Sequence, residues 1–141
     1  MNYGRYCRRI HSPEEKTLKV DKTDKLPALI AEVQELFNTF IRIRDKGQKC
    51  ISCQSKKTAH AGHYKSAGKY SGTRFDETNV NGQCIECNNI KSGNEVPYRE
   101  GLIKKFGELK VQLLEFTAEK EKLKKWSREE LRADKLQDSK G

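Results

Sequence analysis

Two C-x-x-C motifs constrain the fold of this chain more than any other feature. Cys50 and Cys53 form the first motif, Cys84 and Cys87 form the second, and 30 residues separate the two. Four thiolates in two such pairs suit tetrahedral Zn²⁺, and a Cys₄ set leaves no open position for chemistry. We therefore expect a structural zinc ion that closes the segment between the motifs. Free thiols or a redox pair are the alternative, although the βαβ context of a thioredoxin-like motif is missing.

Composition indicates why a chain of this kind would need such a metal ion. With 141 residues, of which 34% are apolar, the chain has material for one domain with a modest core. Small cores usually need a staple. The sequence contains neither a secretion signal nor an apolar run of about 18 residues, so we expect no membrane span. A cytoplasmic protein is predicted, in which five cysteines favour metal binding over disulfides.

Positive charge is concentrated in one part of the chain. The formal net charge is +9, and residues 46–75 contain no Asp or Glu. A focused positive field of this kind indicates a phosphate-binding surface and hence a nucleic-acid partner. A solvated lysine-rich loop is the alternative. The basic residues of this run are Lys46, Lys49, Lys56, Lys57, Lys65, Lys69 and Arg74.

The N-terminal part of the chain divides into an arm and a helix. Residues 1–25 show no sustained periodicity, which predicts a flexible basic arm. Cys7 and His11 in this arm could be half of a metal site, but we expect a free thiol and a solvated histidine. Over residues 26–46 apolar positions recur at three- and four-residue steps, which predicts a helix that Gly47 can end. We expect the apolar face of this helix to pack in the core of the protein. The alternative is that it forms the interface of a dimer.

The C-terminal part is predicted to be helical. After Pro97 an apolar pattern indicates a helix that is broken near Gly107. Ser127 and Glu130 form a capping box, so a third helix is expected from there to about residue 138. The apolar positions of the first of these patterns are Leu102, Phe106, Leu109, Leu113 and Phe116.

The segment between the cysteine motifs is predicted to be a ββα unit. Its glycines rule out a long helix, and two short strand pieces surround a loop. A two-stranded hairpin followed by a short helix from about Ile85 fits best. The predicted fold class is therefore α+β: a single domain over residues 26–141, with a zinc-stapled ββα core at 47–97 between the N-terminal helix and C-terminal helices at 98–141. The interrupting glycines are Gly62, Gly68, Gly72 and Gly82.

Because the zinc site is closed, catalysis would need other groups, and three polar residues are candidates. His63 is expected on the first strand, and Asn88 follows the last cysteine at the start of the helix, so both could face one pocket. A neutral histidine can deprotonate water, and Mg²⁺ on Asn88 can stabilise the leaving 3′ oxygen of a phosphodiester. Asn79 is expected to brace the loop so that His63 keeps its orientation. A purely structural His63 is the alternative.

A resemblance to a known family is carried by the motifs C-I-S-C, A-G-H-Y, R-F-D-E-T-N, Q-C-I-E-C-N-N-I-K-S-G-N and V-P-Y-R. The chain resembles the HNH, or ββα-metal, endonucleases, with His63, Asn79 and Asn88 in the three signature positions. More narrowly, it resembles the NinG (Rap) family of phage recombination endonucleases. This resemblance implies a structure-specific DNA endonuclease acting on branched recombination intermediates such as Holliday junctions and D-loops, in the host cell cytoplasm if the chain is phage-encoded.

One position departs from the HNH pattern. Many HNH enzymes place an acidic or histidine metal ligand directly before the catalytic histidine, whereas this chain has Gly62 there. His60 is the nearest substitute as a ligand of the catalytic Mg²⁺ or Mn²⁺. On a regular strand it would face away from His63, unless a bulge at Gly62 turned it. Asp76 and Glu77 are weaker candidates.

The expected partner is branched or duplex DNA. Basic residues would bind backbone phosphates, and Tyr64 could stack on unpaired bases. Symmetric cutting of a junction would favour a homodimer. The competing hypotheses are a non-catalytic zinc-dependent DNA-binding module and a general nicking HNH nuclease without branch specificity. The candidate DNA-binding residues are Lys56, Lys57, Tyr64, Lys65, Lys69, Arg74, Lys91 and Arg99.

Overall fold

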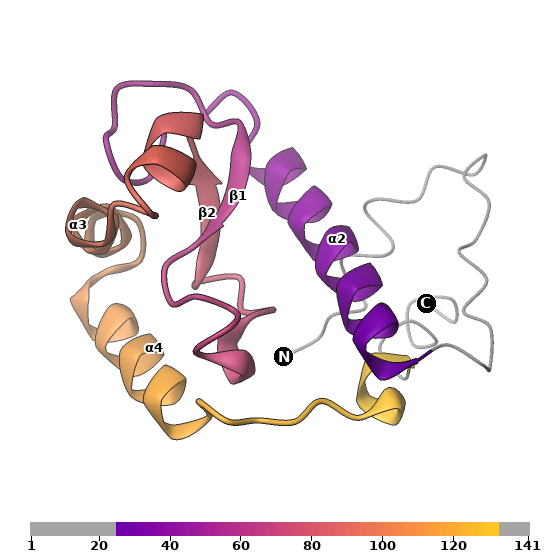
Figure 1. Cartoon of the computed structure of the whole chain (residues 1–141). Coiled ribbons are helices and arrows are strands. Elements are labelled where there is room, and N and C mark those ends of the chain that lie inside the picture. Colours follow the sequence, from indigo (N-terminus) through magenta and orange to yellow (C-terminus); the bar gives the residue numbers. More distant parts are fainter. Residues whose placement is uncertain (1–24, 133–141) are drawn as a thin grey trace. The chain divides into compact units, whose positions relative to one another are not determined.

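A computed structural model describes residues 25–132 of the chain (Figure 1). Helices and a small two-stranded sheet alternate along this part, so the predicted mixed α and β character is confirmed. No helix in this range is long and apolar enough to cross a membrane. The elements are α2 (Leu26–Arg44), β1 (His60–His63), η1 (Ser71–Thr73), β2 (Val80–Gln83), η2 (Glu86–Ile90), α3 (Glu95–Phe106) and α4 (Glu108–Lys120).

The chain groups into two compact units. Within the described residues, one unit joins residues 25–40 with residues 126–132, and the other comprises Ile41–Lys125. The predicted single nuclease domain over residues 26–141 stays a prediction. The predicted arm, with Cys7 and His11, lies outside the described residues except for its last position.

α2 buries the stripe of apolar side chains that its periodicity predicts. Leu29, Val33 and Phe37 are at most 8% exposed, and their spacing places them on one helical face. The helix ends at Arg44 rather than at residue 46. Gly47 follows in a turn with a φ of 82°, a conformation that glycine adopts without the steric cost of a Cβ.

Residues 128–132 are helical and begin at the predicted capping box. Glu130 N donates to Ser127 Oγ at 3.1 Å, and Ser127 N donates to Glu130 Oε1 at 3.4 Å. This exchange satisfies two backbone donors at the start of the helix, which confirms the capping box. The predicted extension of the helix to about residue 138 lies outside the described residues.

β1 and β2 form an antiparallel pair, with His60 opposite Gln83 and His63 opposite Val80. η2 follows β2 as a short π-helix, so the predicted order of hairpin and helix is confirmed. Every residue of β1 has one partner, so the bulge considered at Gly62 is not present in this pairing. Because side chains alternate along a strand, His60 and His63 point to opposite faces.

α3 packs against both the first cysteine motif and β1. Gly101 lies so close to the Ile51 carbonyl that a Cβ at this position would collide with it. Tyr98 is fully buried, and its hydroxyl donates to Gly62 O at 2.7 Å. α3 therefore connects the motif to the strand that carries the candidate catalytic histidine. The apolar cluster of this unit comprises Ile51, Tyr64, Tyr98, Leu102, Val111 and Leu114.

A break at Gly107 separates α3 from α4, as predicted, and its φ of 90° interrupts the helical backbone. The apolar face predicted beyond the break is wrong. Because Gly107 leaves the helical conformation, α4 begins a new helical phase, and a pattern counted through the break selects the wrong side chains. The exposed residues of the predicted face are Leu109, Leu113 and Phe116, whereas the buried residues of α4 are Val111, Leu114 and Ala118.

Candidate metal centre and active site

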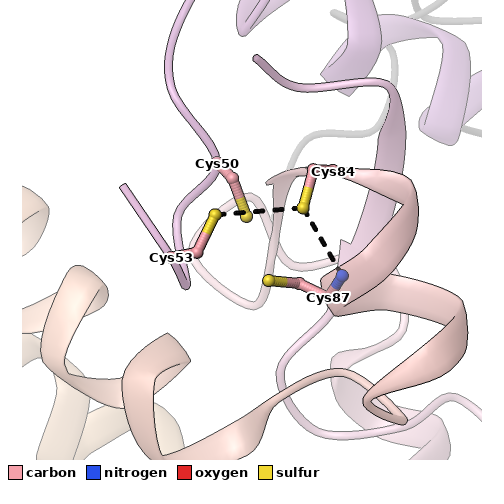
Figure 2. A group of neighbouring side chains, drawn as sticks. All are labelled: Cys50, Cys53, Cys84 and Cys87. Carbon is pink, nitrogen blue, oxygen red and sulfur yellow. Dashed lines mark hydrogen bonds between the residues drawn. The ribbon is translucent and has the colours of Figure 1, made fainter. Parts of the chain in front are cut away.

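The four cysteines of the C-x-x-C motifs meet at one point (Figure 2). Their sulfur atoms all lie within 4.8 Å of one another, and Cys53 Sγ is 3.9 Å from Cys84 Sγ. Cys50, Cys84 and Cys87 are buried, Cys53 is partly exposed, and none of the four forms a disulfide. Four thiols gathered in this way could bind a metal ion such as zinc. The predicted grouping of the motifs is confirmed.

Hydrogen-bond donors surround the sulfur atoms. Cys87 N donates to Cys84 Sγ at 3.4 Å where η2 begins, and Asn94 Nδ2 donates to Cys87 Sγ at 3.6 Å. The hydroxyl of Ser55 donates to Cys53 Sγ at 3.3 Å. Donors of this kind orient metal ligands and offset the negative charge of thiolates. The surroundings therefore fit a thiolate cluster that holds a metal.

The thiols differ in acidity because their surroundings differ. Burial raises the pKa of Cys50, and it raises the pKa of Cys87 to about 12. Burial also acts on Cys53, but donors from Ser55 and Lys56 outweigh it and lower the pKa of Cys53 to about 6. Cys53 therefore gives up its proton more readily than Cys50 and Cys87, from which metal binding would displace protons.

His63 ends β1 and lies against the loop that joins the two strands. Its Nε2 is 3.0 Å from the carbonyl oxygen of Arg74. A carbonyl oxygen can only accept, so Nε2 carries the proton, and Nδ1 is the acceptor nitrogen of the neutral ring. Burial lowers the pKa of His63 below 6.5, although the Arg74 carbonyl partly opposes this shift. The ring is therefore neutral at pH 7, with its proton-accepting nitrogen fixed.

Asn79 is fully buried and ties the loop between the strands together. Its Nδ2 donates to Lys65 O at 3.0 Å and to Thr73 O at 3.1 Å, and its Oδ1 accepts from Lys65 N at 2.8 Å. Thr73 directly precedes Arg74, whose carbonyl contacts His63. The contacts of Asn79 therefore restrain the part of the loop that orients the imidazole. This is the geometry expected of a brace, while a catalytic role for Asn79 stays a prediction.

Asn88 lies in η2, one residue after the last cysteine. Its Nδ2 donates to His60 Nδ1 at 3.2 Å. A Cβ at Gly62 would stand 3.0 Å from Asn88 Oδ1 and would overlap the side chain of Gln83. The structure therefore brings His60 and Asn88 together without a bulge in β1. A single pocket shared by His63 and Asn88 stays a prediction.

Sequence reasoning missed two residues that shape this site. Tyr98 fixes the backbone at Gly62, and Gln83 is fully buried with its Nε2 bonded to Ser52 Oγ at 2.8 Å and Gly93 O at 2.7 Å. A polar residue in a short strand directly before a cysteine motif was the available signal for Gln83. Tyr98 offered no local signal, because its role depends on a contact with a residue 36 positions away.

Four of the predicted phosphate-binding residues have acidic partners. The acidic partners all lie outside residues 46–75. A segment that contains no acidic residue is therefore still in contact with acidic residues in the folded chain. Within residues 25–132, Lys57 and Lys69 form no ion pair. The pairs are Lys56–Glu86, Lys91–Glu86, Lys65–Glu95 and Arg99–Glu115.

Tyr64 belongs to the core rather than to the surface. It is 7% exposed, its ring centroid is 5.4 Å from that of Tyr98, and its hydroxyl donates to Glu115 Oε1 at 2.6 Å. In this conformation the ring cannot stack on a base, so we leave Tyr64 out of the DNA-binding surface proposed below. Tyr70 is partly exposed and lies under the ammonium group of Lys69, 5.6 Å from the ring centroid.

The fold and the cysteine group define a small α+β protein with a two-stranded sheet and four cysteines able to bind a metal. A family model described as Bacteriophage Lambda NinG protein matches residues 7–140, and the chain therefore belongs to the NinG family of phage proteins. Similar proteins are the ninG proteins of Escherichia phage 933W (42% identical over 108 residues), Salmonella phage P22 (41% over 110) and Escherichia phage lambda (39% over 110).

These alignments cover 75%, 77% and 77% of the chain, but only 52%, 53% and 52% of the respective relatives. The chain thus spans about half the length of the curated relatives it matches. No solved structure matches the chain.

Proposed function

We propose that this chain is a metal-dependent DNA endonuclease with an HNH-type ββα-metal core. The observation that carries the proposal is His63, a neutral imidazole whose Nε2 proton is held by the Arg74 carbonyl, so that Nδ1 is the acceptor. The hairpin and η2 follow in the order expected for such a core, and the four cysteines close it. His63 ends β1, Asn79 lies in the loop directly before β2, and Asn88 lies in η2.

The cysteine group would hold a structural zinc ion. All four positions of a tetrahedral Zn²⁺ would be occupied by sulfur, so this ion would leave no position for substrate. The donor set fits, because four sulfur atoms within 4.8 Å of one another are supported by N–H and O–H donors. Its role would be to fix η2, and with it Asn88, against the hairpin.

In the proposed reaction, His63 Nδ1 takes a proton from a water molecule, and the resulting hydroxide attacks the phosphorus atom in line with the leaving 3′ oxygen. The products are a 5′-phosphate and a 3′-hydroxyl. A divalent Mg²⁺ or Mn²⁺, when bound, would offset the charge that develops on the leaving oxygen. Asn88 would hold this cation through its amide oxygen, while its Nδ2 donates to His60 Nδ1 at 3.2 Å. Amide oxygens suit hard cations of this kind.

Branched DNA is the proposed substrate. Support comes from the basic run at residues 46–75, in which Lys57 and Lys69 are exposed, and from the motif resemblance to recombination endonucleases. Phosphate contacts of this kind set affinity and position rather than base sequence. Cutting both strands of a junction symmetrically would require two active sites, which is why we propose a homodimer.

The test uses purified full-length protein, an end-labelled four-way junction and a linear duplex of matched sequence, with and without Mg²⁺ at constant salt. His63→Ala removes the imidazole, and His63→Gln supplies an amide that can still donate to the Arg74 carbonyl but cannot act as the base. We expect metal-dependent cutting of the junction, loss of cutting in both variants, and retained junction binding.

The other outcomes select the competing hypotheses. Equal cutting of duplex and junction would indicate a general nicking nuclease. Binding without cutting in Mg²⁺ and Mn²⁺ would indicate a DNA-binding module. If His63→Gln cuts as fast as the unaltered protein, His63 has only a structural role and the proposed mechanism is wrong.

A further inference from the structure

Gln83 has a buried oxygen atom without a hydrogen-bond partner in the described part of the chain. The residue is fully buried, and Gln83 Oε1 accepts no hydrogen bond. Leaving a buried carbonyl unpaired is unfavourable, because the group loses its hydrogen bonds to water, so such atoms call for an explanation. Exchanging the amide oxygen and nitrogen does not remove the problem. The carbonyl of Gly93, 2.7 Å from Gln83 Nε2, can only accept and so requires the nitrogen at its present place.

A second amide oxygen converges on the same place. Gln83 Oε1 and Asn88 Oδ1 both lie no farther than 3.0 Å from the position that a Cβ of Gly62 would take. Asn88 Nδ2 is turned the other way, toward His60 Nδ1 and Asn89 Oδ1. Two amide oxygens therefore lie beside Gly62, whose missing Cβ allows the Gln83 amide to approach the backbone of β1.

We propose that Gln83 is a ligand of a divalent cation, which it holds with its Oε1 together with Asn88 Oδ1 beside Gly62. Oxygen ligands suit Mg²⁺ and Mn²⁺, and Mg²⁺ commonly keeps several waters beside a small number of protein ligands. His60 is then a positioning residue, because its Nδ1 holds the Asn88 amide with the oxygen toward the cation. The inference rests on the proposed function, since this cation is the one expected to serve phosphodiester hydrolysis.

This arrangement explains why glycine stands at position 62. The HNH resemblance leads one to expect a ligand side chain at this position, but a Cβ here would overlap Gln83 Oε1. In this chain the ligand would instead come from the paired strand β2. Gln83 is well suited to the task, because Ser52 and Gly93 hold its nitrogen and so fix the direction of its oxygen.

The test measures Mn²⁺ binding to zinc-loaded full-length protein without DNA, by the loss of the free Mn²⁺ signal in electron paramagnetic resonance. Four variants are compared with the unaltered protein. Gln83→Met removes the oxygen at similar volume, Gln83→Glu adds a negative charge to it, and Asn88→Asp does the same at the second ligand. Gln112→Glu is the matched control, because it makes the same exchange at an exposed position of α4 and leaves Gln83 and Asn88 unchanged.

We expect one Mn²⁺ site per chain. Gln83→Met should weaken binding about tenfold or more, whereas Gln83→Glu and Asn88→Asp should tighten it several-fold, since affinity follows ligand charge. Gln112→Glu should change the Kd by less than about threefold, because it leaves both oxygens in place and its exposed charge is screened by salt. Zinc content and circular dichroism report on folding. If Gln83→Met does not fold, Gln83→Glu decides, because a residue with only a structural role would not bind Mn²⁺ more tightly as Glu.

No Mn²⁺ binding at millimolar concentration, or an affinity that no Gln83 variant changes, would overturn the inference. Junction cutting is measured separately. If the protein cuts the junction but its Mn²⁺ affinity does not depend on Gln83, the assignment of Gln83 as a ligand is wrong and the proposed endonuclease function stands. Gln83-dependent Mn²⁺ binding without any cutting keeps the cation site and overturns the proposed function.

Discussion

At the scale of single residues, the contacts of His63 and Asn79 determine what the hairpin can do. The Arg74 carbonyl selects the tautomer of His63, and Asn79 restrains the loop that carries this carbonyl. The histidine could be found from the sequence, since it stands in a G-H-Y motif between two cysteine pairs. Its tautomer could not, because a backbone carbonyl that accepts a hydrogen bond can belong to any residue type.

The pH dependence of cutting should report the pKa of His63. Only the neutral ring can accept a proton, so activity is lost as pH falls through the pKa. Burial lowers this pKa, and we therefore expect the acid limb of the single-turnover rate to have its midpoint below about 6.5, the ordinary histidine value. The measurement runs from about pH 5 to 9 under saturating Mg²⁺. A rate that is flat over this range, or a midpoint clearly above 6.5, would contradict the assignment.

At the scale of elements, the cysteine group joins segments that are far apart in the sequence. It connects the turn after α2 to the start of η2, and α3 packs on the first motif through Gly101. The C-x-x-C spacing predicted this grouping. The contact through Gly101 was not predictable, because a glycine chosen for close approach looks the same in sequence as one chosen for a turn.

Removing the metal should unfold this region. A chelator is expected to abolish the dispersed amide signals of β1, β2 and η2 in nuclear magnetic resonance spectra, and one equivalent of Zn²⁺ should restore them, because metal binding and folding are coupled. Cys84→Ser should have the effect of the chelator. Cys7→Ser, which alters the cysteine outside both motifs, is the matched control and should leave one zinc per chain. Unchanged spectra after complete zinc removal would show that the fold does not depend on the metal.

The junction between α3 and α4 depends on a glycine with positive φ. Gly107→Ala should lower the free energy of unfolding by about 1 kcal/mol, because alanine is strained at a φ of 90°. Gly68→Ala is the control, since neither positive φ nor a neighbour within 4 Å opposes a Cβ there. Urea denaturation of both variants measures the difference. Equal stabilities would mean that the backbone at Gly107 relaxes without cost.

The same glycine explains where helix prediction failed. The periodicity of residues 26–46 gave the buried face of α2 because no residue interrupts that helix. After Gly107 the stripe of Leu109, Leu113 and Phe116 is exposed instead. Periodicity determines a face only within one continuous helix, and the rotation across a break depends on a backbone angle that the sequence does not state.

At the scale of the whole molecule, a net charge of +9 overstates the field available to DNA. A single acidic residue, Glu86, forms ion pairs with both Lys56 and Lys91. The pairs are exposed and therefore contribute little to stability, but they place negative charge beside the proposed phosphate-binding groups. Composition predicts that the partner is negatively charged. The strength of the attraction depends on which acidic residues of other elements lie next to the basic residues in the folded chain.

Removing Glu86 should therefore strengthen DNA binding more than the loss of one charge elsewhere. We expect Glu86→Gln to tighten duplex binding several-fold at low salt and to steepen its salt dependence, because Lys56 and Lys91 become available to phosphates. Glu100→Gln changes the net charge equally and is the control, since Glu100 forms no ion pair within the described residues. Fluorescence anisotropy at two salt concentrations measures both. Equal effects would mean that net charge alone governs affinity.

The loop closed by the cysteine group has a consequence for how such proteins diversify. The 30 residues between the motifs are held at both ends by the same four sulfur atoms. The entropy cost of closing a loop rises only with the logarithm of its length, by roughly 0.6 kcal/mol for each doubling. Insertions at the exposed tip around Gly68 would therefore cost little stability. Among homologues, length variation should concentrate at this tip, while the segments that carry the four cysteines keep their length.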